Sequence, residues 1–114
     1  GGGGEECRAA VAAMSERVLS LQQQVSKTKQ TVATLDGQLA ELKVMKQAAV
    51  DARAFKDAST INVQLKALAA THENEEALLA SSLLQLEEVN GRLQEERARL
   101  EALSTVESGE EDKL

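Results

Sequence analysis

The sequence predicts an all-α protein in which two long helices pack against each other as an antiparallel coiled-coil hairpin. The 114 residues contain no proline and a single aromatic residue, Phe55. Proline breaks helix interiors, and globular cores normally bury several aromatic rings. Apolar residues recur at alternating steps of four and three along both halves of the chain, which is the heptad pattern of coiled coils. The pattern is interrupted near the middle, where we expect the chain to reverse direction.

The first helix is expected to follow a flexible leader, residues 1–4, which consists of glycine alone. The coiled-coil hairpin itself is assigned to residues 5–106. Its first apolar stripe occupies eleven heptad positions, of which ten are apolar: Cys7, Val11, Met14, Val18, Leu21, Val25, Thr28, Val32, Leu35, Leu39 and Leu42. The stripe is then expected to slip, because Lys46 occupies the strict heptad position while Met45 and Ala49 continue the apolar pattern. A phase change of this kind alters the local winding, as expected near a bend.

The reversal is expected near residues 52–57, with the chain folding about Ala54. Asp57, Ser59 and Thr60 carry side-chain oxygens that are suited to capping the start of a new helix. Phe55 is expected to fold inward and to cover the end of the apolar stripe.

The second helix carries a weaker stripe, with nine apolar residues at thirteen heptad positions: Ile61, Leu65, Leu68, His72, Glu75, Leu79, Ser82, Leu86, Val89, Leu93, Glu96, Leu100 and Leu103. Of these, His72 and Glu75 are expected to form a polar layer that specifies register. A pH switch at His72 is the alternative interpretation. After the stripe ends, residues 107–114 are predicted to form an acidic disordered tail.

Two dipeptides that often form turns, Asp36-Gly37 and Asn90-Gly91, lie inside the heptad runs. A glycine in the middle of a helix costs only about 1 kcal/mol relative to alanine. We therefore expect both helices to continue through these dipeptides.

Residues 49–68 resemble the UVR helical-hairpin motif of bacterial excision-repair proteins. The resemblance is carried by the order of Ala49, Val50, Phe55, Ala58, Ile61, Leu65 and Leu68, whereas Ala54 and Lys56 stand where that family usually has acidic residues. It implies an antiparallel hairpin that binds another such hairpin and has no catalytic role. Similar hairpins occur in ciliary and centrosomal coiled-coil proteins.

Three leucines outside the second stripe, Leu78, Leu83 and Leu84, are predicted to form an exposed apolar contact surface. Since two helices alone cannot cover these side chains, we expect hairpins to associate into a dimer or a four-helix assembly. Other helical proteins are further expected partners. A parallel dimer of straight helices is the alternative architecture, because valine and leucine at the heptad positions also suit that arrangement.

The predicted bend is positively charged, although the whole chain has a net charge of −6. Between residues 43 and 66 there are five basic and two acidic residues, a net charge of +3. Lys43, Lys46, Arg53 and Lys56 are therefore predicted to bind an acidic partner, such as the acidic tails on a microtubule. The negative charge of the whole chain argues against binding to nucleic acid.

These patterns predict a non-enzymatic coiled-coil interaction or scaffold module of a larger cytoskeletal or assembly protein. No catalytic, metal or cofactor site is predicted, because the sole cysteine and the sole histidine, Cys7 and His72, are expected far apart in the hairpin. Cys7 is expected to serve as a small hydrophobic residue of the stripe. A single cysteine excludes an internal disulfide, and no apolar run reaches the roughly 20 residues that span a bilayer. We therefore expect no membrane contact and an intracellular location, in the cytoplasm or cytoskeleton, with the nucleus as the alternative.

Overall fold

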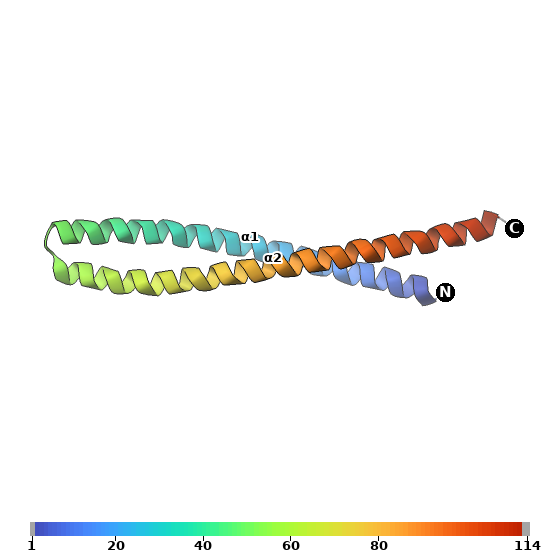
Figure 1. Cartoon of the computed structure of the whole chain (residues 1–114), viewed down its shortest axis with the longest axis horizontal. Coiled ribbons are helices and arrows are strands. Elements are labelled where there is room, and N and C mark those ends of the chain that lie inside the picture. Colours follow the sequence, from blue (N-terminus) through green and yellow to red (C-terminus); the bar gives the residue numbers. More distant parts are fainter. Residues whose placement is uncertain (1, 113–114) are drawn as a thin grey trace. The chain divides into compact units, whose positions relative to one another are not determined.

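The computed structural model describes the backbone of residues 2–112 and the side chains of residues 3–106. Two long helices, α1 (Gly2–Asp51) and α2 (Phe55–Asp112), are joined by a turn at residues 52–54 (Figure 1). No strand occurs within residues 2–112. Lys46 of α1 hydrogen-bonds to Asn62 of α2, and Asp36 of α1 pairs with His72 of α2. The pair nearer to the turn on α1 is thus also the nearer pair on α2, as in antiparallel helices. The predicted all-α hairpin of two antiparallel helices is therefore confirmed.

Both helices extend beyond the predicted bounds. α1 includes Gly2–Gly4, which the glycine content predicts to be flexible, and α2 includes residues 107–112 of the predicted disordered tail. Helix growth explains the difference, because each residue added to an existing helix gains a hydrogen bond and no proline is present to stop the helix. Gly1, Lys113 and Leu114, which belong to the same predicted segments, lie outside the described residues.

The two glycine dipeptides do not interrupt the helices, as the heptad pattern predicts. Gly37 lies inside α1 and Gly91 lies inside α2. A Cβ atom added at either position would meet no other atom within 4 Å. These glycines are therefore not required by close packing, and the helices continue through them despite their low helix propensity.

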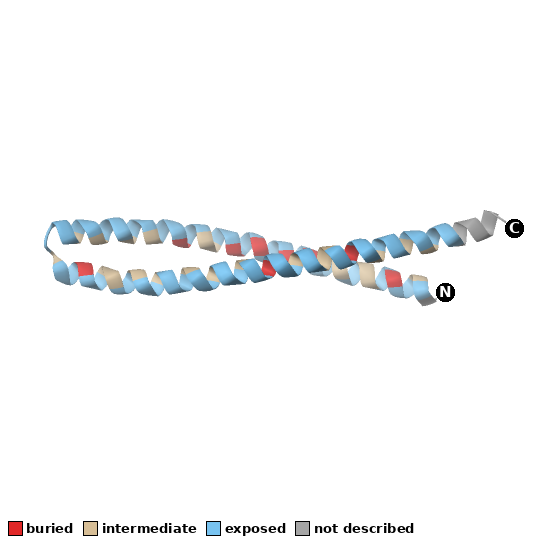
Figure 2. Ribbon diagram, viewed as in Figure 1, coloured by how far each residue is buried: buried red, intermediate tan, exposed pale blue. Residues whose placement is uncertain are grey.

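The chain divides into two compact units, and each consists of a segment of α1 and a segment of α2. The turn unit comprises residues 25–81, and the terminal unit comprises residues 1–24 together with residues 82–114. In both units the buried and half-buried residues recur along the helices at the spacing of the stripes, separated by exposed residues (Figure 2).

The inner stripe of the turn unit is only partly buried. Four of its residues are buried: Val25, Thr28, Leu35 and Ala58. The remaining heptad positions nearer the turn are half-buried, and they include the apolar residues Leu39, Leu42, Ile61, Leu65 and Leu68. Two helices thus shield these side chains from water on one side only.

The register of the turn unit is fixed by two polar pairs. The Lys46 amino group donates a hydrogen bond to Asn62 Oδ1 over 2.8 Å, and His72 Nε2 lies 2.6 Å from Asp36 Oδ1. Lys46 and Asn62 each lie eight residues from Ala54, and Asp36 and His72 each lie eighteen residues from it. The turn unit therefore folds about Ala54, as predicted from the sequence.

The predicted slip of the first stripe is wrong. Lys46 is half-buried at the strict heptad position, whereas Met45 is 53% exposed. The long aliphatic part of a lysine can cover apolar surface while its amino group reaches a polar partner, which here is Asn62. A charged residue therefore fits the inner stripe without a change of phase.

The terminal unit has its own buried stripe, formed by Cys7, Val18, Leu21, Ser82 and Leu93. Polar side chains also join its two helix segments, since Arg17 donates to Gln85 Oε1 over 3.0 Å and Gln24 donates to Ser82 Oγ over 3.1 Å. Leu21 has no exposed surface, and Ser82 is almost completely covered. The heptad pattern thus predicts the buried residues of this unit correctly.

Arg53, two residues after the end of α1, adopts a backbone conformation that is usually found in glycine. Its φ angle is 59°, in the left-handed region. The backbone N–H of Ala54 donates to the carbonyl of Ala49 over 2.8 Å, and the N–H of Arg53 donates to the carbonyl of Val50 over 3.0 Å. These two bonds form a Schellman motif, in which a left-handed residue reverses the chain after the last helical turn.

The predicted cap of α2 is wrong, and so is the predicted inward position of Phe55. The helix begins at Phe55, directly after Ala54, so Asp57 already lies within the first turn, and Thr60 donates back to the carbonyl of Lys56. Asp57 instead interacts favourably with the positive end of the helix dipole. Phe55 is 63% exposed, because the first position of α2 does not face the inner stripe.

Candidate functional site

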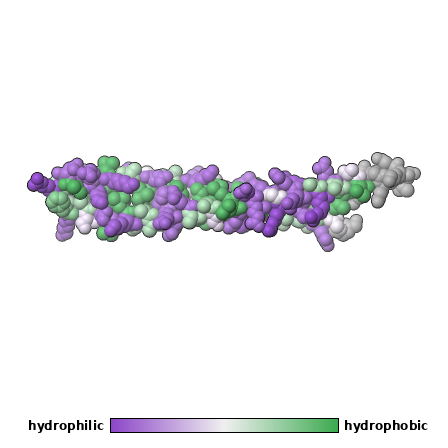
Figure 3. Space-filling view, in the orientation of Figure 1, coloured by the Kyte–Doolittle hydropathy of each residue, from purple (hydrophilic) through white to green (hydrophobic). Residues whose placement is uncertain are grey.

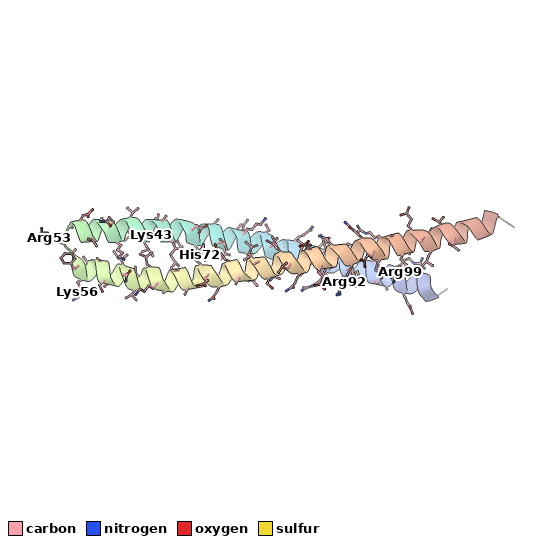
Figure 4. All side chains as sticks on the ribbon, viewed as in Figure 1. Lys43, Arg53, Lys56, His72, Arg92 and Arg99 are labelled. Carbon is pink, nitrogen blue, oxygen red and sulfur yellow. The ribbon has the colours of Figure 1, made fainter. Side chains whose placement is uncertain are left out.

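The four basic residues predicted to bind a partner all belong to the turn unit, but they differ in environment. Lys43, Arg53 and Lys56 are exposed, and Figure 4 shows Arg53 and Lys56 at the turn itself. Lys46 is half-buried, and its amino group bonds Asn62. Three of the four residues therefore present free surface charge, whereas Lys46 helps to hold the two helices together.

The backbone at Arg53 carries conformational strain. For a residue with a Cβ atom, the left-handed region costs about 1–2 kcal/mol, whereas glycine adopts it freely. The turn thus holds a guanidinium group at the one position where the backbone would favour glycine. Residues kept in such conformations often have a functional role.

The three predicted leucines are all exposed, as expected, but they belong to different units. Leu78 lies in the turn unit, and Leu83 and Leu84 lie in the terminal unit. Leu83 lines a shallow groove of about 590 Å³ along α2, together with Leu86, Glu87, Asn90, Gly91 and Gln94. The leucines are therefore described as two separate surfaces, one in each unit.

A groove in the turn unit was not predicted from the sequence. It has a volume of about 500 Å³ and is lined from α1 by Gln38, Glu41, Leu42 and Met45 and from α2 by Gln64, Ala67, Leu68 and Thr71. Half-buried Leu42 and Leu68 form its apolar floor. Only one of its eight lining residues, Glu41, is charged. Figure 3 shows apolar side chains reaching the surface of the turn unit between hydrophilic ones.

A signal for this groove was present in the heptad positions that flank the stripes. Such flanking positions in coiled coils usually carry Glu and Lys. On the groove side of α1 they carry Gln38 and Met45, and on α2 they carry Gln64 and Thr71. Uncharged flanking positions on both helices therefore indicate a surface that is suited to contact with another protein as well as with water.

The predicted polar layer at His72 contains a residue of α1 that the sequence did not single out. His72 Nε2 lies 2.6 Å from Asp36 Oδ1 and 3.5 Å from Glu76 Oε1, and Figure 4 shows His72 within the turn unit. Glu75 is half-buried beside it. The layer thus joins the two helices through a carboxylate and an imidazole, which is the geometry expected of a group that specifies register.

Cys7 is buried in the terminal unit, as predicted for a small residue of the stripe. Its thiol donates to the backbone carbonyl of Glu96 at 3.2 Å and lies 3.3 Å from the Glu96 carboxylate. Burial raises the pKa of the Cys7 thiol, and the Glu96 carboxylate raises it further. The thiolate form, which is the reactive one, is therefore disfavoured.

No group of three or more His, Cys, Asp or Glu within residues 2–112 is arranged to hold a metal ion. Over the same residues, neither helix contains a stretch that is long and apolar enough to cross a membrane. Comparison of the chain with families of known proteins, with curated proteins and with solved structures finds no match, and the resemblance of residues 49–68 to the UVR motif therefore stays a prediction.

Proposed function

We propose that this hairpin is a non-enzymatic protein–protein interaction module that self-associates and serves as part of a larger intracellular scaffold or cytoskeletal assembly. One observation carries the proposal, namely the number of large apolar side chains that lie outside the inner stripes and remain exposed: Leu19, Val44, Met45, Val50, Phe55, Val63, Leu78, Leu83, Leu84 and Val106. Contiguous exposed apolar surface usually marks a site of interaction, and here exposed Met45 adjoins the half-buried Leu42 and Leu68 in one groove.

The energetics favour association. Covering one such side chain completely contributes about 1.5–3 kcal/mol. The inner stripe of the turn unit is also incompletely shielded, since Leu39, Leu42, Leu65 and Leu68 stay half-buried. A second helical surface would cover exposed side chains and complete the stripe at the same time.

Sedimentation equilibrium on the whole chain tests this proposal, at protein concentrations from about 1 µM to about 200 µM, which brackets the range of modest association constants. The proposal predicts a weight-average mass that rises with concentration above that of the monomer. A folded chain that keeps the monomer mass over the whole range would contradict self-association.

A second function is favoured by the strained backbone at Arg53. Binding of an acidic polymer, such as a microtubule surface, would use the exposed charges of Lys43, Arg53 and Lys56. The presence of a charged residue in a strained backbone conformation that suits glycine supports a role for the guanidinium group. Attraction of this kind weakens as salt screens the charges.

Charge reversal at the turn tests the second function. The double variant Arg53→Glu/Lys56→Glu is expected to lose salt-sensitive binding to microtubules in a co-sedimentation assay. The double variant Lys27→Glu/Lys29→Glu is a matched control, because it makes the same change of charge at two exposed residues of the same unit, away from the turn. Equal binding by the two variants would exclude a role for the turn.

A further inference from the structure

The two sides of the turn unit differ in charge. The side with the 500 Å³ groove carries one charged residue, Glu41, among its eight lining residues. On the other side, the Asp36 carboxylate meets His72, and Glu76 lies beside the same imidazole. The side with Asp36 and His72 is thus suited to contact with water, whereas the side with the groove presents apolar and amide groups.

The uncharged surface extends beyond the groove along both helices. Residues seven positions apart lie on the same side of a helix in a coiled coil. On α1 this repeat links Gln38 and Met45 to Thr31, and on α2 it links Gln64 and Thr71 to Leu78 and, beside the turn, to Asp57. Asp57 is the one charged residue of these seven, and Leu78 and Met45 are both exposed. We call the part of this surface without Asp57, together with its floor of Leu42 and Leu68, the uncharged face.

We propose that the uncharged face binds the same face of a second copy of the chain, so that two turn units form a four-helix assembly with two-fold symmetry. The inference rests on the proposed function and names its contact surface. In a two-fold interface each surface meets itself, so a face with strong charge of one sign would repel its own copy. The uncharged face limits this repulsion, because Glu41 is the one charged residue among the eight that line its groove.

The polar groups of the face are also self-complementary. A glutamine side chain has both a donor NH₂ group and an acceptor carbonyl, so Gln38 and Gln64 can bond the equivalent amides of a second copy. In the middle of the face, Leu42 and Leu68 are half-buried and Met45 is 53% exposed. A second copy would therefore cover the side of the inner stripe that two helices leave open.

The size of the face is sufficient for a modest interface. The 20 steps from Thr31 to Asp51, the last residue of α1, correspond to about 30 Å of helix, and two neighbouring helices are about 20 Å wide. The face therefore offers about 600 Å² per copy, or about 1,200 Å² in total, which is the lower end of the range for specific interfaces. We expect a dimer that forms in the micromolar range.

The test introduces negative charge on the face and, separately, on the opposite side of the turn unit. The double variant Met45→Glu/Gln64→Glu places two carboxylates on the uncharged face of each copy. The control Ala33→Glu/Ala69→Glu makes the same change of charge at two exposed residues, which the helix period places on the side of Asp36 and Glu76. All four positions are exposed, so both variants are expected to keep the helical circular dichroism of the wild type.

Sedimentation equilibrium then measures the dimer dissociation constant of each protein. The face variant is expected to dimerise at least about 100-fold more weakly than the wild type, because like charges that face each other across an interface are strongly unfavourable. The control is expected to dimerise as the wild type does. A face variant that dimerises normally, or a control that is weakened equally, would overturn the assignment of the face and leave self-association intact. A wild-type chain that stays monomeric would instead overturn the proposed function.

A mixing experiment provides positive evidence that does not depend on loss of binding. The variant Met45→Lys/Gln64→Lys is also expected to be monomeric alone. When it is mixed with Met45→Glu/Gln64→Glu, opposite charges face each other and a one-to-one heterodimer is expected. A mixture that stays monomeric, while the wild type dimerises at the same concentration, would overturn the inference.

Discussion

Arg53 offers the sharpest test of the turn, because substitutions at this residue have opposite effects in a hairpin and in a straight helix. Its φ angle of 59° places it in the left-handed region, where a Cβ atom costs about 1–2 kcal/mol. Glycine avoids this cost, but it gives the unfolded chain about 0.4–1 kcal/mol of additional conformational entropy. In the hairpin, Arg53→Gly is therefore expected to be more stable than Arg53→Ala by about 0.5–1 kcal/mol. In a continuous helix, alanine is the more stable of the two by about 1 kcal/mol.

The comparison of glycine with alanine isolates the backbone effect. Both substitutions remove the guanidinium group, so they change charge and surface contacts equally and differ only in the Cβ atom. Urea unfolding followed by far-UV circular dichroism gives the free energy of unfolding of each variant. Measurements at one low protein concentration keep association from contributing. A chain in which Arg53→Ala is the more stable variant would refute the left-handed turn at this residue.

Three further predictions concern the helices and the terminal unit. Gly37→Ala and Gly91→Ala are each expected to raise the free energy of unfolding by about 0.8–1 kcal/mol, since both residues are helical and the added Cβ meets nothing within 4 Å; urea unfolding that shows a loss of stability would contradict the continuous helices. Leu21→Ala is expected to lower the free energy of unfolding by about 3–5 kcal/mol, because Leu21 has no exposed surface; a loss below about 1 kcal/mol in the same assay would exclude its burial. The pKa of the Cys7 thiol is raised in the folded state, so the folded chain holds the thiol proton more tightly than the unfolded chain does. The protonated thiol therefore stabilises the folded state below the unfolded pKa of about 8.5, and this stabilisation is lost as the pH rises through the folded pKa. The stability of the wild type relative to Cys7→Ala is therefore expected to fall between about pH 8 and about pH 10, and a difference that stays constant over this range would contradict the raised pKa.

The heptad pattern predicts most of the fold because two-helix packing depends on few variables. The stripe positions from Cys7 to Leu42 specify which side of α1 is inward, and their period implies a helix even through Gly37. The interruption between the two stripes then places the turn, and the pairs that lie at equal distances from Ala54 agree with that position. Local signals for turns are weak in comparison with a pattern that extends over many residues.

The details near the turn could not be predicted in the same way, because each depends on local geometry. Arg53 gives no sign in the sequence that it adopts a conformation typical of glycine. The position of Phe55 follows from the residue at which α2 begins, and helix boundaries are the least certain part of a sequence-based prediction. The heptad phase of the first stripe is kept at Lys46 because this side chain hydrogen-bonds to Asn62. A pattern of hydrophobic residues cannot predict such a hydrogen bond.

The uncharged face was missed for a different reason. Summing the charges between residues 43 and 66 gives +3 and describes the turn region as one basic surface. The structure distributes these charges around the helices and leaves one side nearly without charge, as the residues that line the groove demonstrate. Counting charge separately at each flanking heptad position would have identified this side from the sequence.

The distance between two spin labels tests the hairpin most directly. Labels attached to cysteines at Ala40 and Ala69, which are exposed and lie on α1 and α2 of the turn unit, are introduced in a Cys7→Ser background, and the labelled chain is diluted with unlabelled chain so that only pairs within one molecule contribute. The hairpin predicts a distance below about 25 Å, since neighbouring helices lie about 10 Å apart and the two labels add the remainder. A distance of about 44 Å, the length of 29 residues of uninterrupted helix, would contradict the reversal of the chain at residues 52–54.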